Sequence, residues 1–285
     1  MSVRRVIVGV DSRESSEAAL DWAVAETAAV GSVLVIGHAA AHVMGASPAR
    51  RRNPGVPGGD RILAWAVAVA GRRLDPGRIQ PVLRSGAAGG ALVDLAYAED
   101  ILVLGAPTHR HRMGPRSATG YVLGHAPCPV VVVPSRSSVA QRRESLSAPA
   151  RPDVGRPDPV VVGVPRSEAA RGPLAFGFAY AARHRLPLTA VHVTGRTHGE
   201  DWLDGQVPEP ATARLLAEQL EKFEREYPRV AVRRLVMVGE VVPGLVSASD
   251  GATLLVAGAA ESGVSPVVRE LVDNGVCPVV VVRRH

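Results

Sequence analysis

The chain has 285 residues and a formal charge of +6; 46% of its residues are hydrophobic, although only 4% are aromatic. This length is about twice the commonest domain size, so it predicts two compact domains. A core of Val, Leu, Ile and Ala suits buried strands packed against Ala-rich helices, and the composition therefore favours an α/β fold.

The basic residues do not indicate a nucleic-acid partner. Lys222 is the only lysine, the arginines are scattered, and the one run of three, at 50–52, lies in a Pro/Gly-rich segment. A nucleic-acid surface concentrates basic residues on one face and adds aromatic side chains for base stacking. We therefore expect no binding to nucleic acid.

The amino-terminal segment and the cysteines argue against membrane and metal classes. Arg4 and Arg5 precede a short apolar run that ends at Asp11, which is too brief for a signal sequence, and no later run approaches a membrane span. Cys128 and Cys277 have no second cysteine or close histidine at metal-ligand spacing. We expect buried thiols, no metal and no membrane contact, and a cytoplasmic location.

An internal repeat divides the chain. VIVGV at 6–10 returns as VVVGV at 160–164, LVLGA at 102–106 as LVAGA at 255–259, and CPVVVV at 128–133 as CPVVVV at 277–282. The offset near 150 residues is far longer than the period of a solenoid, about 20 to 50 residues, and indicates a duplicated domain. We place the first domain at 1–135, a poorly ordered linker rich in Ser, Pro and Arg at 136–157, and the second domain at 158–285.

Each half is expected to alternate strands with helices. Short apolar runs in the first half predict strands at 3–10, 33–38, 80–84, 101–105 and 129–133. Runs that are apolar on both faces suit a parallel sheet covered by helices on both sides.

Three helices stand out in the sequence. The first is expected to begin after Ser15 and Ser16, which are good N-caps, and the second to cover about 60–73 with Asp60 as its cap. The third, at about 210–226, ends before Pro228. Residues expected on the buried faces of the first and third helices are Leu20, Ala23, Val24, Thr27, Leu216, Leu220, Phe223 and Tyr227.

Together these segments resemble the universal stress protein family. Gly9-Val10-Asp11 with the Ala-rich helix resembles the family's opening, and LVLG at 102–105 with HAPCPV at 125–130 resembles its close. The second half matches through YP at 227–228, VRR at 232–234, Gly239 and CPV at 277–279. The chain is identified as a tandem, two-domain member of that family, matched almost throughout apart from the linker.

The resemblance implies a fold and a ligand class. Each half should be a doubly wound, Rossmann-like parallel sheet of five strands in the order 3-2-1-4-5, with ligands at the carboxyl edge between strands 1 and 4. The family contains ATP binders and non-binders, and the binders carry G-x2-G-x9-G-(S/T) after strand 4. Glycines admit phosphates to backbone N–H groups, and the hydroxyl and helix N-terminus receive the anion.

The first half keeps the base-binding part of this pattern. Gly9, Val10 and Asp11 match the end of strand 1, where the acidic residue resembles the family's adenine and ribose contact. Ala39 matches the end of strand 2, where the backbone meets the base. The alternative is that Asp11 only caps a turn.

The phosphate loop of the first half departs from the pattern. Gly105 matches the first glycine, but Thr108 replaces the second. The final Gly-Ser pair appears as Arg116-Ser117 after a loop about two residues short. Such a deletion shortens the reach of an extended chain by roughly 7 Å.

Other residues offset part of this loss. Ser117 and Thr119 keep the hydroxyls, Gly114 gives flexibility under another alignment, and Arg116 can hold phosphate by its charge. The sequence thus predicts a regulatory stress protein with a weak ATP or adenine-nucleotide site in the first half. The alternative is a nucleotide-free scaffold or interaction protein of the same fold.

The second half has lost more of the pattern. Pro165 replaces the acidic residue, and Glu261 puts a carboxylate at the second glycine. Ser265-Pro266 stands at the Gly-Ser position, where proline removes a donor. We expect this site to be degenerate.

No residue pattern indicates catalysis. His109-Arg110-His111-Arg112 invites a metal or nucleic-acid interpretation, but no carboxylate or cysteine nearby completes a ligand set, so a solvated loop is preferred. His38 and His192, each near the end of a second strand, are interpreted as partly buried, hydrogen-bonded side chains. We expect a binding protein and not an enzyme.

The last apolar run of each half is expected to be packed against another part of the protein. The runs at 129–133 and 278–282 would be exposed sheet edges in isolated domains. We therefore expect the two halves to form an intramolecular pseudo-dimer about a pseudo-twofold axis, with a homodimer of whole chains left open.

Overall fold

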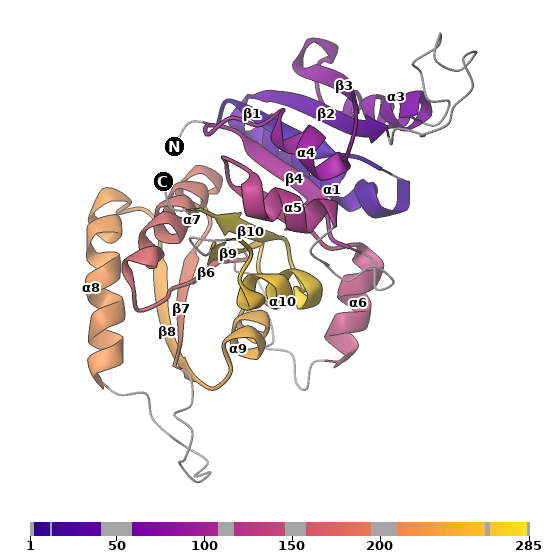
Figure 1. Ribbon diagram of the computed structural model, residues 1–285. Coiled ribbons are helices and arrows are strands. Elements are labelled where there is room, and N and C mark those ends of the chain that lie inside the picture. The colour runs from indigo at the N-terminus through magenta and orange to yellow at the C-terminus, as the bar shows by residue number, and fades with distance from the viewer. Residues whose placement is uncertain are drawn as a thin grey trace, which may run out of the picture. The chain divides into compact units, whose positions relative to one another are not determined.

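The computed structural model describes residues 3–11, 13–40, 59–107, 117–145, 158–194, 210–259 and 263–283. The chain divides into two compact units, Ser2–Arg136 and Ser137–His285. Each unit is a parallel sheet with helices on its faces (Figure 1).

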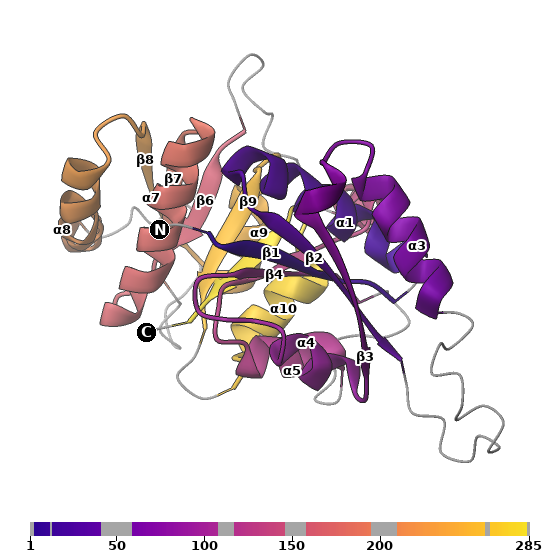
Figure 2. The same cartoon turned by 90° about the horizontal axis from the view of Figure 1, so that it is seen from above.

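The first unit has five strands in the order β3-β2-β1-β4-β5, all paired in parallel. Helices α1 and α3 cover one face, and α4 and α5 the other (Figure 2). In chain order the elements are β1 (Arg5–Gly9), α1 (Arg13–Val30), β2 (Val33–Ala40), α3 (Gly59–Ala70), a 3₁₀ turn (Pro76–Arg78), β3 (Ile79–Ser85), α4 (Ala88–Val93), β4 (Ile101–Gly105), α5 (Ala118–His125) and β5 (Val130–Val133).

The second unit repeats this arrangement in the order β8-β7-β6-β9-β10. Both units therefore confirm the predicted doubly wound fold; how their last strands are covered stays a prediction. The elements are α6 (Arg136–Ser145), β6 (Val160–Gly163), a 3₁₀ turn (Glu168–Ala170), α7 (Arg171–His184), β7 (Leu188–Thr194), α8 (Pro210–Glu226), β8 (Val232–Val238), α9 (Val241–Ala248), β9 (Leu254–Gly258), α10 (Pro266–Asn274) and β10 (Val279–Val282).

The first strand of each unit is the centre of its core. Val6, Ile7 and Val8 have no exposed surface, because β1 lies between β2 and β4 and helices cover both sheet faces. Seven of the eight residues predicted on the buried faces of α1 and α8 are buried: Leu20, Ala23, Val24, Thr27, Leu216, Leu220 and Phe223. For Tyr227 the prediction is wrong, because it follows the end of α8 at Glu226 and is half-buried. Hydrophobic burial on both faces thus explains why these strands are uninterrupted apolar runs.

Two predicted helix starts are wrong. Helix α1 begins at Arg13, so Ser15 and Ser16 lie inside it and are not its caps. Helix α3 includes Gly59, so Asp60 stands within the helix and not before it. In α1 the Ser16 hydroxyl instead binds Asp11, five residues earlier in the chain, and is therefore not available as a cap.

The first part of the expected linker is a helix. Residues 136–145 form α6, which the sequence did not suggest because its apolar residues have no period. Arg142 donates to the carbonyl of Gly275, and Arg143 pairs with Asp250 at 2.8 Å, so contacts with the second unit hold α6. Burial lowers the pKa of Arg142. The rest of the expected linker, 146–157, lies outside the described residues.

Both cysteines are buried free thiols, as predicted. Burial in an apolar environment raises the pKa of Cys128 and of Cys277 to about 12. At neutral pH each thiol is therefore protonated and behaves as a small apolar side chain.

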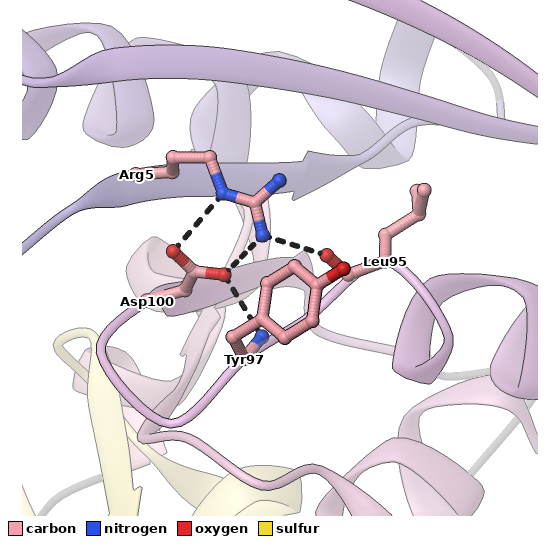
Figure 3. A network of polar contacts seen from close by, with 4 residues as sticks. All are labelled: Arg5, Leu95, Tyr97 and Asp100. Atoms are coloured by element: carbon pink, nitrogen blue, oxygen red, sulfur yellow. Dashed lines mark hydrogen bonds and ion pairs between the residues drawn. The ribbon is translucent and has the colours of Figure 1, made fainter.

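A buried ion pair fixes the amino end of the first unit's central strands (Figure 3). Arg5 at the start of β1 donates two hydrogen bonds to Asp100, which has no exposed surface, and a third to the carbonyl of Leu95 at 2.9 Å. Asp100 also accepts the backbone N–H of Tyr97 at 2.9 Å, and the Tyr97 ring lies over the guanidinium. The pair joins β1 to the segment that enters β4, and Asp100 raises the pKa of Arg5.

Replacing Asp100 by asparagine should destabilise the first unit by about 3 kcal/mol. The reason is that removing one partner of a buried pair leaves the other charge uncompensated. Urea unfolding followed by the fluorescence of Trp22 and Trp65, in a Trp202→Phe background, reports on this unit.

The matched control is Asp21→Asn. Asp21 and Arg136 are 3.5 Å apart, but their side chains are 44% and 91% exposed. An exposed pair contributes little, so this variant should change stability by less than about 0.5 kcal/mol. Equal effects of the two variants would contradict the importance of the buried pair.

Candidate functional site

The candidate site lies at the carboxyl ends of β1 and β4, where the strand order of the first unit reverses. Val10 and Asp11 follow β1, and the pairing of Val8 with Val103 places Gly105 beside the end of β1. Such a switch point leaves a crevice outside the sheet, because the connections from the two strands run to opposite faces.

Asp11 is exposed and is fixed by Ser16. Its backbone N–H donates to Ser16 Oγ at 3.1 Å, and the Ser16 hydroxyl donates to Asp11 Oδ1 at 3.0 Å. Ser16 is 2% exposed, so it belongs to the packed first turns of α1. Asp11 therefore presents an exposed carboxylate after β1, and the orientation of that carboxylate depends on α1.

His38 forms a hydrogen bond with the backbone just beyond the same end of β1. Its Nδ1 lies 2.6 Å from the carbonyl oxygen of Val10, which can only accept, so Nδ1 carries the hydrogen. His192 makes the same contact with the carbonyl of Val164 in the second unit, at 2.7 Å. The interpretation of both histidines as hydrogen-bonded side chains is confirmed.

Gly9 is explained by packing. A Cβ at Gly9 would lie 2.7 Å from Leu92 Cδ1 and 2.8 Å from Leu104 Cδ2. Gly37 is similarly close to Leu92, at 2.9 Å. Leu92, on α4, thus occupies the space over both glycines. Ala39 lies two residues beyond Gly37, near the carboxyl end of β2, and is half-exposed.

Of the two predicted hydroxyl groups after β4 that the structure describes, one caps a helix and the other is buried. Ser117 is the N-cap of α5 and accepts the N–H of Gly120 at 3.0 Å, while Thr119 is 8% exposed. The structure brings the ends of β1, β2 and β4 to one edge. Three of the predicted site residues, Thr108, Gly114 and Arg116, lie outside the described residues.

The second unit replaces the acidic strand end by internal contacts. Pro165 stands in the place of Asp11, and its carbonyl accepts from Gln219 at 3.2 Å. Next to it, Arg166 donates to Thr212 on the same helix, α8, also at 3.2 Å. Helix α8 is therefore tied to the loop after β6.

Gly258, the counterpart of Gly105, is crowded. A Cβ built there would lie 3.2 Å from Pro173 Cγ. Glu261, predicted to oppose phosphate, lies outside the described residues. At the start of α10, Ser265 accepts the N–H of Val268 and Pro266 follows at the first helical position, where it supplies no N–H.

Sequence reasoning did not assign Ser16 and His38 to the site. For Ser16 the available signal was its position five residues after Asp11, just beyond the end of the strand. Within the described residues no group of three or more His, Cys, Asp or Glu is arranged to hold a metal, and no helix has the length and apolar content to cross a bilayer.

One family model matches the sequence of both units. The model of the universal stress protein family matches residues 2–134 and again 157–283. The chain belongs to the universal stress protein family. Its tandem character, predicted from the internal repeat, is thereby confirmed.

Relatives in mycobacteria have similar length. Universal stress protein Rv2623 of Mycobacterium tuberculosis is 26% identical over 276 residues, which cover 90% of this chain and 87% of that protein. Universal stress protein Rv2005c of the same organism is 26% identical over 303 residues, covering 98% and 97%. Both similarities extend over the two halves of this family member.

Solved structures support the fold. A universal stress protein from Archaeoglobus fulgidus matches with a TM-score of 0.71 at 13% identity, over 98% of this chain and 96% of that one. A functionally unknown protein, PA1789 from Pseudomonas aeruginosa, matches with a TM-score of 0.57, also at 13% identity, over 99% of this chain and 93% of that one. At this identity the likeness concerns the architecture alone.

Replacing Ser117 by alanine should open the first turn of α5. The N-cap hydroxyl satisfies an otherwise unpaired helix N–H, and its loss costs about 1 kcal/mol. We expect the Gly120 amide to exchange its hydrogen about fivefold faster, as measured by NMR. Ser265→Ala is the matched control, since it should speed the exchange of Val268 and leave Gly120 unchanged; a Gly120 amide indifferent to Ser117→Ala would contradict the cap.

Proposed function

We propose that this universal stress protein is a regulatory protein that binds an adenine nucleotide weakly at one site, in its first unit. The observation that carries the proposal is the exposed carboxylate of Asp11, oriented by Ser16, at the carboxyl end of β1. A carboxylate in that place can accept hydrogen bonds from ribose hydroxyls or a base amine. Gly105, at the end of β4, is on the other side of the same switch point.

The two units differ in a way that supports binding to one of them. Pro165 offers neither a carboxylate nor an N–H, and its carbonyl is engaged by Gln219. Pro266 removes an N–H from the first turn of α10, and Pro173 packs against Gly258. A nucleotide would therefore find fewer donors in the second unit, and Pro173 beside Gly258.

We infer that affinity is low because the phosphate part of the first site is incomplete. The hydroxyl of Ser117 already accepts the Gly120 N–H, and Thr119 is buried. Each missing charge-assisted phosphate hydrogen bond costs about 1.5–3 kcal/mol. Losing two of them is enough to turn a micromolar site into one near the millimolar range.

The capping role of Ser117 favours a second function, that of a nucleotide-free scaffold protein with this fold. If Ser117 serves only as the cap of α5, its hydroxyl is not available to an anion, and Asp11 only closes the turn before α1. The two functions differ in a measurable way, because only the first requires Asp11 for ligand binding.

One weak ATP site is expected in a calorimetric titration of the whole chain. Asp11→Ala should weaken it strongly, because the base and ribose contact is lost, and Ser117→Ala should weaken it less. Glu168→Ala is the matched control: it removes an acidic residue after β6, in the second unit, and should leave binding unchanged. Two equal tight sites, or one site indifferent to Asp11→Ala, would rule out this function.

We further propose that the protein binds without enzymatic turnover. The Ser16 hydroxyl donates to the Asp11 carboxylate, but at 2% exposure it is inaccessible to a substrate. Coupled phosphate-release measurements should therefore give far less than about one ATP hydrolysed per second. A faster rate that Asp11→Ala eliminates would show an enzyme.

A further inference from the structure

One peptide unit at the edge of the first unit's sheet is held at both of its polar ends. The carbonyl of Val10 accepts from His38, on β2, and the N–H of Asp11 donates to Ser16, on α1. The two contacts come from different elements: β2, which is paired with β1, and α1, which follows β1 in the chain. The orientation of the Val10–Asp11 peptide is therefore set by tertiary structure and not by the strand alone.

The side chains that hold this peptide are themselves fixed. The Nδ1 of His38 carries its hydrogen, because a carbonyl oxygen is its partner at 2.6 Å. Ser16 is 2% exposed, so packing restricts its rotamer, and its hydroxyl hydrogen is directed to Asp11 Oδ1. Backbone and carboxylate of Asp11 are thus restrained through one hydroxyl group.

We propose that His38 and Ser16 are positioning residues for the ligand of the first unit. They orient Asp11 in advance, so that the contact is already formed when the ligand arrives and less conformational freedom is lost on binding. Neither side chain needs to touch the ligand. This proposal rests on the proposed nucleotide function and adds the residues through which α1 and β2 determine its affinity.

The second unit provides an internal comparison. His192 holds Val164 as His38 holds Val10, but the next residue is Pro165, which has no N–H. Ala170 stands where the first unit has Ser16, as the alignment of Leu20 with Leu174 shows. The histidine contact therefore recurs without the carboxylate, whereas the serine contact is found together with Asp11.

The test is a double-mutant cycle read by ATP titration. His38→Leu and Ser16→Ala should each weaken binding about tenfold, and the conservative changes His38→Asn and Ser16→Thr, which keep a donor or a hydroxyl, should stay within about twofold. In an Asp11→Ala background, titrated with enough ATP to measure the residual affinity, the same changes should have no further effect, because they act through Asp11.

A merely structural role would give a different result. Loosening of the whole first unit would weaken binding equally with or without Asp11. His192→Leu, the matched control, changes the equivalent contact in the second unit and should leave binding unchanged. All variants are compared well below their thermal midpoints. Additive losses, or no loss in either single variant, would overturn the positioning role.

A second readout does not depend on the ligand. By NMR the Asp11 amide should exchange at least about tenfold faster in Ser16→Ala than in the unmodified chain, because its acceptor is gone. If the unmodified chain binds no ATP, the proposed function fails and positioning for that ligand fails with it. Unchanged exchange in Ser16→Ala overturns the restraint itself, even when ATP binds.

Discussion

The burial of β1 on both faces and along both edges is the constraint on which the first unit depends. Val6, Ile7 and Val8 have no exposed surface, and their strand is paired on both sides. Such a strand can carry no polar side chain along its length, because an unpaired buried polar group costs too much. Chemistry is therefore confined to the two ends of β1, and the two ends have different tasks.

The ion pair at the amino end of β1 stabilises the fold, whereas the residue after its carboxyl end exposes a carboxylate. At the amino end the Arg5–Asp100 pair is turned inwards and joined to backbone groups, so its charges are used within the protein. At the carboxyl end the carboxylate of Asp11 is exposed and restrained by a serine. The second unit has Pro159 where Arg5 stands and links the same place through Thr253 and the carbonyl of Asp158 at 2.9 Å. Different side chains thus close equivalent strand ends.

The sequence predicted what depends on apolar pattern and missed what depends on particular tertiary contacts. The strands follow from short apolar runs, and most of the buried residues of α1 and α8 follow from helical spacing. Helix α6 does not, because a hydrogen bond from Arg142 to a distant carbonyl helps to hold it. The serines after Asp11 fit the N-cap pattern, yet Ser16 instead binds back to the strand end. The partner of His38 is a backbone carbonyl, and no residue type reveals such a partner.

Comparison of the two units shows which contacts recur after the first strand. The imidazole-to-carbonyl bond occurs in both, at His38 and at His192, so the peptide after the strand is held in the same way whether it leads to Asp11 or to Pro165. The carboxylate and the hydroxyl that restrains it occur in the first unit and are replaced together, by Pro165 and Ala170, in the second. Their joint replacement fits the hydrogen bonds of the first unit, because Pro165 has neither the carboxylate nor the N–H that the Ser16 hydroxyl contacts at Asp11. A hydroxyl in place of Ala170 would therefore lose both of these partners at the strand end.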